Sequence, residues 1–174
     1  LTYANNGGGT GNLIIIPKSS ISNTIENPNN SLKIPVIVGD GNQNSPFMIS
    51  TADELINIAE SGLDKHYMIT SKIDLSAIDF SPLGEFSGSI NGVGQGSIVG
   101  LNIKSTKEID GILYGGLFTK NTGVISNLQI SGKIDLELNK NAKVGLIAGE
   151  NFGTLQNVHV NLENSMIKVL TTEM

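Results

Sequence analysis

The chain has 174 residues, a formal net charge of −5 and no cysteine. This length supports one sizeable hydrophobic core, and no apolar run is long enough to cross a membrane. The acidic balance argues against nucleic acid as a partner, because proteins that bind nucleic acids present a basic face. Without cysteine the chain has neither a disulfide framework nor a thiolate metal site.

Residues 1–45 are expected to form an irregular N-terminal segment with short strands. The first twelve residues are rich in glycine and asparagine, which favours irregular backbone. Short strands are predicted at 21–25 and 32–38, separated by a turn at 26–30. Pro35 makes the second of these an edge strand, because proline donates no hydrogen bond to a neighbouring strand.

Three side chains that carry oxygen, Asp40, Asn42 and Asn44, stand at alternate positions. Alternate oxygens in a turning loop can converge on a hard cation such as calcium. Only one of the three is charged, however, and no glutamate follows at the spacing of an EF-hand loop. The pattern fits an ordinary turn better than a calcium site, and we predict neither a bound metal nor a cofactor.

One helix is predicted, over Ala52–Ser61. Thr51 and Glu54 form a capping box, in which the Thr51 hydroxyl accepts a hydrogen bond from the Glu54 amide and Glu54 reaches back. Aliphatic residues follow at helical spacing, and Gly62 ends the run. We expect this helix to cover the end of a stack of β-strands, because exposed strand edges invite other strands.

The second half of the chain repeats itself at a period of about thirty residues, which predicts a stack of similar units. Gly116–Ile130 reads GLFTKNTGVISNLQI, and Gly145–Val160 reads GLIAGENFGTLQNVHV. A fainter copy, Gly96–Ile103, aligns with Gly123–Ile130. We place the repeats from about Phe86 onward and treat 46–174 as one domain, truncated at its C-terminal end.

Each repeat predicts short strands, sharp corners and inward aliphatic side chains. Leu128 and Ile130 alternate along one strand and so share a face. Asn127 and Asn157 occupy equivalent corners, where stacked amides can hydrogen-bond and a left-handed backbone is tolerated. Gly100 takes that corner in the alignment of the fainter copy. In the segment KIDLEL, Lys133–Leu138, charged and apolar residues alternate, which predicts a half-buried strand with a charged outer face.

No catalytic arrangement emerges from the titratable residues. Asp74 and Asp79 are close in sequence, but nothing nearby would tune the pKa of one carboxyl against the other. The glycines of 92–96 lack the GxGxxG spacing and a following helix, so tight turns are favoured over a phosphate site. His66 and His159 have no partner pattern and are predicted to be structural or exposed. We therefore assign no catalytic, cofactor-binding or metal-binding residue.

The segments GLFTKNTGVISNLQISG and GLIAGENFGTLQNVHV resemble the GLUG repeat, and the region of resemblance spans about 46–160. Thr119 replaces the second signature glycine in one copy, and Ala148-Gly149 shifts it in the next. The resemblance implies an all-β, right-handed parallel β-helix in a large secreted or cell-wall-anchored bacterial protein. It carries no catalytic residues.

The sequence is compatible with three functions. The favoured one is a non-enzymatic extracellular module that adheres to a host protein, a matrix component or a glycan. A stalk or accessory domain of a surface protease is the second, although no HExxH motif is present. A carbohydrate-active enzyme is the third, opposed by the scattered placement of the acidic residues. The sequence indicates no oligomeric state.

Overall fold

The computed structural model describes residues 24–27, 30–35 and 39–170. The chain divides into two compact units, Leu1–Val38 and Gly39–Met174. In the first unit, β1 (Thr24–Asn27) pairs with β2 (Asn30–Pro35) in antiparallel fashion, with Thr24 opposite Pro35. The predictions for residues 1–23 and 36–38 lie outside the described residues. Loop residues 39–45 belong to the second unit.

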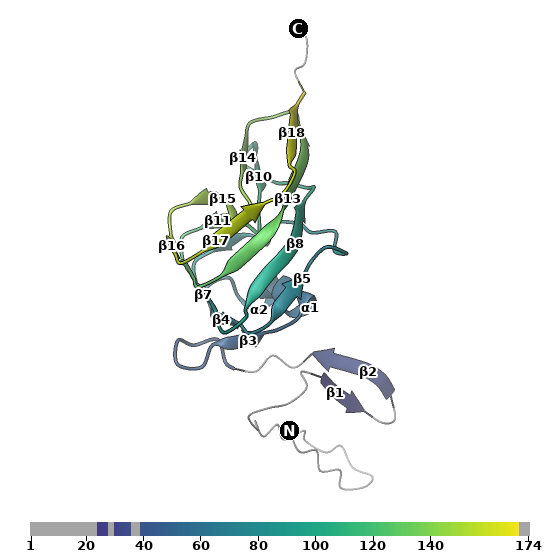
Figure 1. The fold of residues 1–174 in the computed structure, drawn as a ribbon, viewed down its shortest axis with the longest axis vertical. Helices are drawn as coiled ribbons and strands as arrows, with labels where there is room; N and C mark the ends of the chain where they lie inside the picture. The colour runs from purple at the N-terminus through teal and green to yellow at the C-terminus, as the bar shows by residue number, and fades with distance from the viewer. Residues whose placement is uncertain (1–23, 28–29, 36–38, 171–174) are drawn as a thin grey trace, which may run out of the picture. The chain divides into compact units, whose positions relative to one another are not determined.

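The predicted helix is present as two consecutive short helices, α1 (Ala52–Ile56) and α2 (Ile58–Ser61). The capping box is confirmed: the Glu54 amide donates to the Thr51 hydroxyl at 3.2 Å, and Glu54 Oε2 accepts from the Thr51 amide at 3.1 Å. Leu55 and Ile58 are fully buried, so the helices pack by their aliphatic side. In Figure 1 they lie at the end of the second unit that also holds β3–β5.

The second unit is otherwise built from strands in several small, mainly parallel sheets, which confirms the all-β class. Two sheets have five strands each. The first contains β3 (Phe47–Ile49), β4 (His66–Ile69), β7 (Ser89–Gly92), β12 (Val124–Ser126) and β16 (Thr154–Gln156). The second contains β5 (Lys72–Asp74), β8 (Ser97–Ile103), β13 (Gln129–Leu138), β17 (His159–Leu162) and β18 (Met166–Val169), which also pairs with β13.

Two smaller sheets complete the unit. One contains β6 (Glu85–Phe86), β11 (Phe118–Asn121) and β15 (Ala148–Asn151). The other contains β9 (Lys107–Ile109), β10 (Ile112–Gly115) and β14 (Ala142–Val144). No helix among the described residues combines the length and the apolar character that a membrane span requires.

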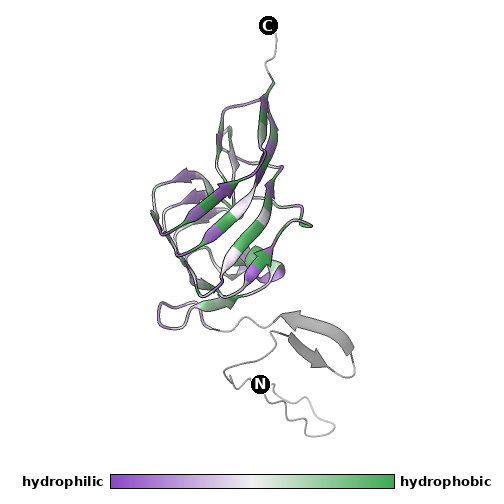
Figure 2. Ribbon diagram, in the orientation of Figure 1, coloured by the Kyte–Doolittle hydropathy of each residue, from purple (hydrophilic) through white to green (hydrophobic). Residues whose placement is uncertain are grey.

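Each strand pairs with the strand that occupies the equivalent place in the next repeat. Ile125 of β12 lies between Ile90 of β7 and Leu155 of β16. Ile130 of β13 lies between Ile98 of β8 and Val160 of β17. Each set of short parallel strands thus brings inward aliphatic side chains into register along the stack, and the strands alternate hydrophobic and hydrophilic residues (Figure 2).

The core is continuous along this stack. The residues at the start of the two clear repeats are at most 8% exposed: Leu117, Phe118, Leu146 and Ile147. Phe86 and Phe118 stack with their ring centroids 4.6 Å apart, and Tyr67 lies 6.4 Å from Phe86. Aromatic pairs of this kind add stability beyond the apolar area they bury. The predicted half-buried strand is also confirmed, because Ile134, Leu136 and Leu138 are buried while Asp135 and Glu137 are exposed.

The alignment of the fainter copy was wrong. Val124 pairs with Ser89, so Gly123 lies over Gly88 and not over Gly96. A Cβ on Gly123 would come within 2.1 Å of the Gly88 carbonyl oxygen, so this close approach requires glycine. Gly100 has a φ of +66° but is the extra residue of a β-bulge in β8, not a repeat corner. Matching letters alone missed the additional turn between β7 and β8.

A β-hairpin formed by β9 and β10 was not predicted. Ile109 pairs with Ile112 across Asp110-Gly111, whose φ values are +51° and +77°. Positive φ at both positions of a two-residue loop is the type I′ turn, for which Asp-Gly is a preferred pair. The dipeptide was therefore the sequence signal that could have located the hairpin.

Candidate binding face

The outward side chains of β5, β8, β13 and β17 form the candidate site, which we call the groove face. Lys72 pairs with Ser97, Ser97 with Gln129, and Gln129 with His159, so these four residues form one row across the four strands. The row is outward because the neighbouring position in each strand points inward: Ile73, Ile98 and Ile130 are at most 1% exposed. In Figure 1 the four strands lie side by side.

A hollow of about 420 Å³ lies along this row. Lys72, Gln129 and His159 are exposed, and Ser97 is half-buried. Val99, Ser131 and Asn161 continue the lining along the strands. The site therefore presents an ammonium, an imidazole, two hydroxyls and two amides, which can donate or accept hydrogen bonds. The residues that line it include no carboxylate and no Phe, Tyr or Trp side chain.

One carboxylate lies close to the row without lining the hollow. Asp74 Oδ1 accepts a hydrogen bond from the Ser76 amide at 2.9 Å. Hydrogen bonds from the Ser76 backbone and side chain, and then the charge of Lys72, lower the pKa of Asp74 below its usual value. A carboxyl with a lowered pKa is ionised at neutral pH and is therefore a poor general acid.

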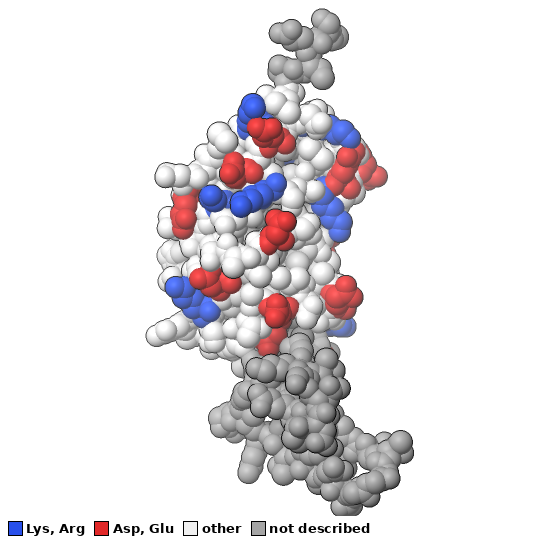
Figure 3. Space-filling view, turned by 90° about the vertical axis from the view of Figure 1, so that its right-hand side faces the viewer, with Lys and Arg blue, Asp and Glu red and all other residues white. Residues whose placement is uncertain are grey.

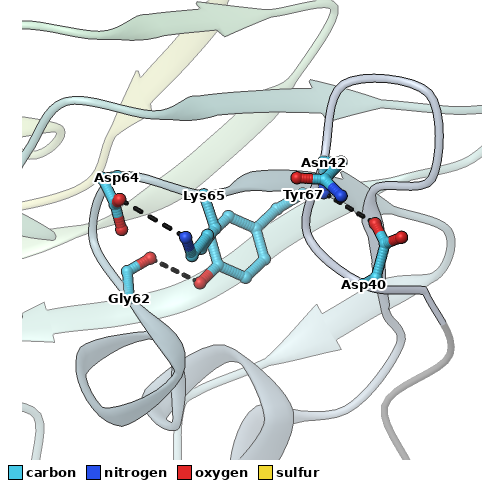
Figure 4. Close-up of polar contacts among 6 residues, drawn as sticks. All are labelled: Asp40, Asn42, Gly62, Asp64, Lys65 and Tyr67. Carbon is cyan, nitrogen blue, oxygen red and sulfur yellow. Dashed lines mark hydrogen bonds and ion pairs between the residues drawn. The ribbon is translucent and has the colours of Figure 1, made fainter.

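The Asp40 loop contains an ordinary turn. Asp40 Oδ1 accepts from the Asn42 amide at 2.9 Å (Figure 4). The Ser45 amide donates to the Asn42 carbonyl at 3.0 Å. The one charged oxygen donor of the proposed calcium pattern thus already has a local partner. Among the described residues, His, Asp and Glu form no group of three or more that could hold a metal ion.

The other sequence candidates are dispersed. His66 Nδ1 lies 2.6 Å from the hydroxyl of Ser89, its pairing partner in the other five-stranded sheet, whereas His159 belongs to the groove face. The glycine-rich segment 92–96 is a turn between β7 and β8, in which the Gly96 amide donates to the Val93 carbonyl at 3.0 Å. Asp79 is exposed. In the described part of the chain, none of these residues therefore forms with Asp74 the arrangement that acid–base catalysis would need.

The corner asparagines form a ladder, as predicted for Asn127 and Asn157. Their φ values are +52° and +51°. Asn157 Nδ2 donates to Asn127 Oδ1 at 3.1 Å, and Asn127 Nδ2 donates to Asn91 Oδ1 at 2.8 Å. A second amide pair, from Asn121 to Asn151, spans 2.7 Å. These amide groups hydrogen-bond to one another from repeat to repeat, so their role here is structural.

On the side of the second unit that Figure 3 shows, charged side chains of the two signs are mixed. Exposed pairs such as Lys140–Glu108, at 2.8 Å, and Lys168–Glu137, at 3.1 Å, account for part of this pattern. Such a surface gives little electrostatic attraction for a polyanion.

Sequence analysis missed the groove face as a unit. Lys133 and Glu137, taken there as the charged outer face, lie further along β13, and Glu137 is paired with Lys168. Lys72, Ser97 and Gln129 belong to segments separated by loops of different length. The alternation of polar and apolar residues in each strand was a signal that each residue pointed outward, but their common row depended on the strand register.

The chain resembles a known bacterial protein over part of its length. No protein-family model matches the chain, and no solved structure matches it with significance. The chain is 32% identical over 137 residues to a protein of Evansella cellulosilytica named "Putative Gly-rich membrane protein". The alignment covers 71% of this chain but 15% of that protein, so the chain spans a small part of the relative's length.

Proposed function

We propose that Gly39–Met174 is a segment of a right-handed parallel β-helix of the GLUG-repeat type. Two observations support this arrangement. Strands of successive repeats pair in parallel in the same order in separate sheets. The asparagine ladders also join residues 30 positions apart in the last two repeats, which is the spacing expected when one repeat makes one turn of the stack.

The function that this arrangement supports best is non-enzymatic binding at a bacterial cell surface, with a glycan as the ligand. The observation that carries the proposal is the row Lys72–Ser97–Gln129–His159 over its hollow. Parallel strands lie about 4.8 Å apart. An extended chain rich in hydroxyl groups, laid across the strands, would meet a hydrogen-bonding side chain at each strand.

The chemistry of the groove face favours binding over catalysis. Hydrolysis of a glycosidic bond normally uses two carboxyl groups that flank the bond. The residues lining the hollow supply none, and the nearby Asp74 is held ionised by Ser76. A carbohydrate-active enzyme is therefore the weaker proposal.

The location is proposed on two grounds. The GLUG-like repeats are typical of secreted and cell-wall-anchored bacterial proteins, and the relative from Evansella cellulosilytica is named a membrane protein. A host or matrix protein remains an alternative ligand on such a surface, and a stalk or protease-accessory role is the alternative without a ligand.

Binding to a panel of glycans and extracellular-matrix proteins tests the function. The Lys72→Ala/Gln129→Ala/His159→Ala variant changes three exposed positions of the groove face, and we expect it to lose at least about tenfold in affinity for a glycan that the chain binds. Lys107→Ala/Gln156→Ala changes exposed residues of two other sheets and is the matched control. A glycan bound equally by both variants would place the ligand elsewhere, and no saturable binding across the panel would favour the spacer role.

A further inference from the structure

Two of the four methionines of the chain lie side by side on the outward face of the first five-stranded sheet. Met48 of β3 pairs with Met68 of β4, and the next pair along, Ile49 with Ile69, is fully buried. Because side chains alternate between the two faces of a strand, the methionines point away from the core. Both are half-buried. Paired residues of neighbouring parallel strands lie about 4.8 Å apart, so the two thioethers share one patch of surface.

His66 brings an imidazole to the same face. It precedes Met68 by two residues in β4, and the intervening Tyr67 is 1% exposed. His66 and Met68 therefore point to the same side, about 6.6 Å apart along the strand. A methionine side chain has three rotatable bonds, so its sulfur can turn toward the ring of a neighbouring residue. Two thioethers and one imidazole can thus converge on a single ion.

The hydrogen bonding of His66 leaves one ring nitrogen available. β4 lies between β3 and β7 in the sheet (Figure 1), and His66 Nδ1 is 2.6 Å from the hydroxyl of Ser89 in β7. His66 Nε2 has no hydrogen-bond partner among the described residues. A hydrogen bond at one ring nitrogen sets the tautomer and the orientation with which the other nitrogen binds a metal. Ser89 is placed to orient the imidazole in this way.

We propose that Met48, Met68 and His66 form a binding site for one soft monovalent metal ion, Cu(I). Thioether sulfur and imidazole suit copper, whereas calcium and magnesium take oxygen ligands. The chain has no cysteine, so methionine is its source of sulfur ligands. This set differs from the groups of His, Asp and Glu considered above, because two of its three members are thioethers. The site belongs to a different sheet from the groove face, so it does not depend on glycan binding.

Silver(I) is the first probe, because it is a soft monovalent ion that needs no reductant in solution. The full chain is labelled with carbon-13 at its methionine methyl groups, and silver nitrate is added in a chloride-free buffer at neutral pH. We expect the methyl signals of Met48 and Met68 to shift together and to saturate at about one equivalent. Met166 is 57% exposed and is the internal control, whose signal should not respond over that range.

Substitutions then identify the ligands. Met48→Leu/Met68→Leu removes both sulfur atoms and nearly conserves side-chain volume. We expect it to lose at least about tenfold in affinity for Cu(I), measured by competition with a Cu(I) chelator without oxygen. His66→Phe retains an aromatic ring but offers no nitrogen, and the same minimum loss is expected. Met166→Leu is the matched control and should bind as the unchanged chain does.

Two results would overturn the proposal. Methionine signals that respond to silver(I) in order of exposure, with Met166 first, would show adventitious thioether binding only. Equal Cu(I) affinity of the unchanged chain and Met48→Leu/Met68→Leu would exclude the thioethers as ligands. The silver titration needs no substitution, so it decides the question even if a variant fails to fold. Zinc(II) is expected to shift neither methyl signal, because it prefers thiolate, imidazole and carboxylate ligands; shifts equal to those with silver(I) would overturn the assignment to a soft metal.

Discussion

The two ends of the second unit contain similar aliphatic residues but differ in how far they are buried. At the helical end, Ile49, Leu55 and Ile58 are fully buried. At the other end, Leu155 is 42% exposed although it occupies the position of the buried Ile125. The strands alone therefore do not bury their inward side chains, because each layer needs a neighbour on both sides. α1 and α2 provide that second neighbour at one end.

The largest difference in unfolding free energy is expected between alanine variants of two paired residues, Ile125 and Leu155. Ile125→Ala removes a fully buried side chain between two layers and is expected to lower the free energy of unfolding by about 2–5 kcal/mol. Leu155→Ala, one layer later, is expected to cost less than about 1 kcal/mol, because much of the side chain is already in water. Urea denaturation measures both values. Equal costs would mean that Leu155 is covered in solution.

A pH titration examines the helical end. Tyr67 is 1% exposed, and its hydroxyl donates to the Gly62 carbonyl at 2.6 Å, just after α2 (Figure 4). Burial, and then the charge of Asp64, raises the pKa of Tyr67 to about 12. The folded state therefore holds this proton more tightly than the unfolded chain, whose tyrosine titrates near 10. The resulting stabilisation is complete below pH ~10 and is lost as the pH rises through about 12.

We expect the native chain to lose about 2 kcal/mol of stability over that window from this residue. Tyr67→Phe keeps the ring packing but has no proton to lose, so the difference in stability between the two proteins should narrow as the pH rises from 9 toward 12. Denaturation at several pH values measures the difference. A constant gap across the window would show that Tyr67 titrates normally in the folded protein.

The capping box gives a smaller effect at the same end. Thr51→Ala removes the acceptor of the Glu54 amide and is expected to lower the free energy of unfolding by about 1 kcal/mol. Thr51→Ser retains the acceptor and is the matched control, with an expected loss of less than about 0.5 kcal/mol. Thermal unfolding followed by circular dichroism compares them. If both variants lost the same stability, the methyl group and not the hydrogen bond would be responsible.

The features that the sequence predicted correctly are determined by residues close to one another in the chain. Thr51 and Glu54 are three residues apart, and the two clear repeats contain the same corner asparagine, so local chemistry was sufficient to find the helix start and the left-handed corners. The alternation in KIDLEL predicted which side chains of β13 are buried for the same reason.

The features that were missed depend on which segments lie side by side. Gly100 was given the corner of Asn127, but the strand register pairs Asn91 with Ser126 and so places Gly92 beside Asn127. Gln129 pairs with Ser97, whereas nearby Val124 pairs with Ser89, so one fixed period does not describe the earlier layers. The groove face needs all four strand registers at once, which no single repeat encodes.

The smallest expected effects on stability come from the asparagine ladder, where an inner layer can be compared with the last one. Asn127→Gly keeps the left-handed backbone accessible but removes amide bonds to the layers on both sides, whereas Asn157→Gly removes one bond on one side. We expect losses of about 1 kcal/mol and about 0.5 kcal/mol, since exposed amide bonds contribute little individually. Chemical denaturation of the two variants measures the ratio. Equal losses would mean that the second amide bond of Asn127 contributes nothing measurable to stability.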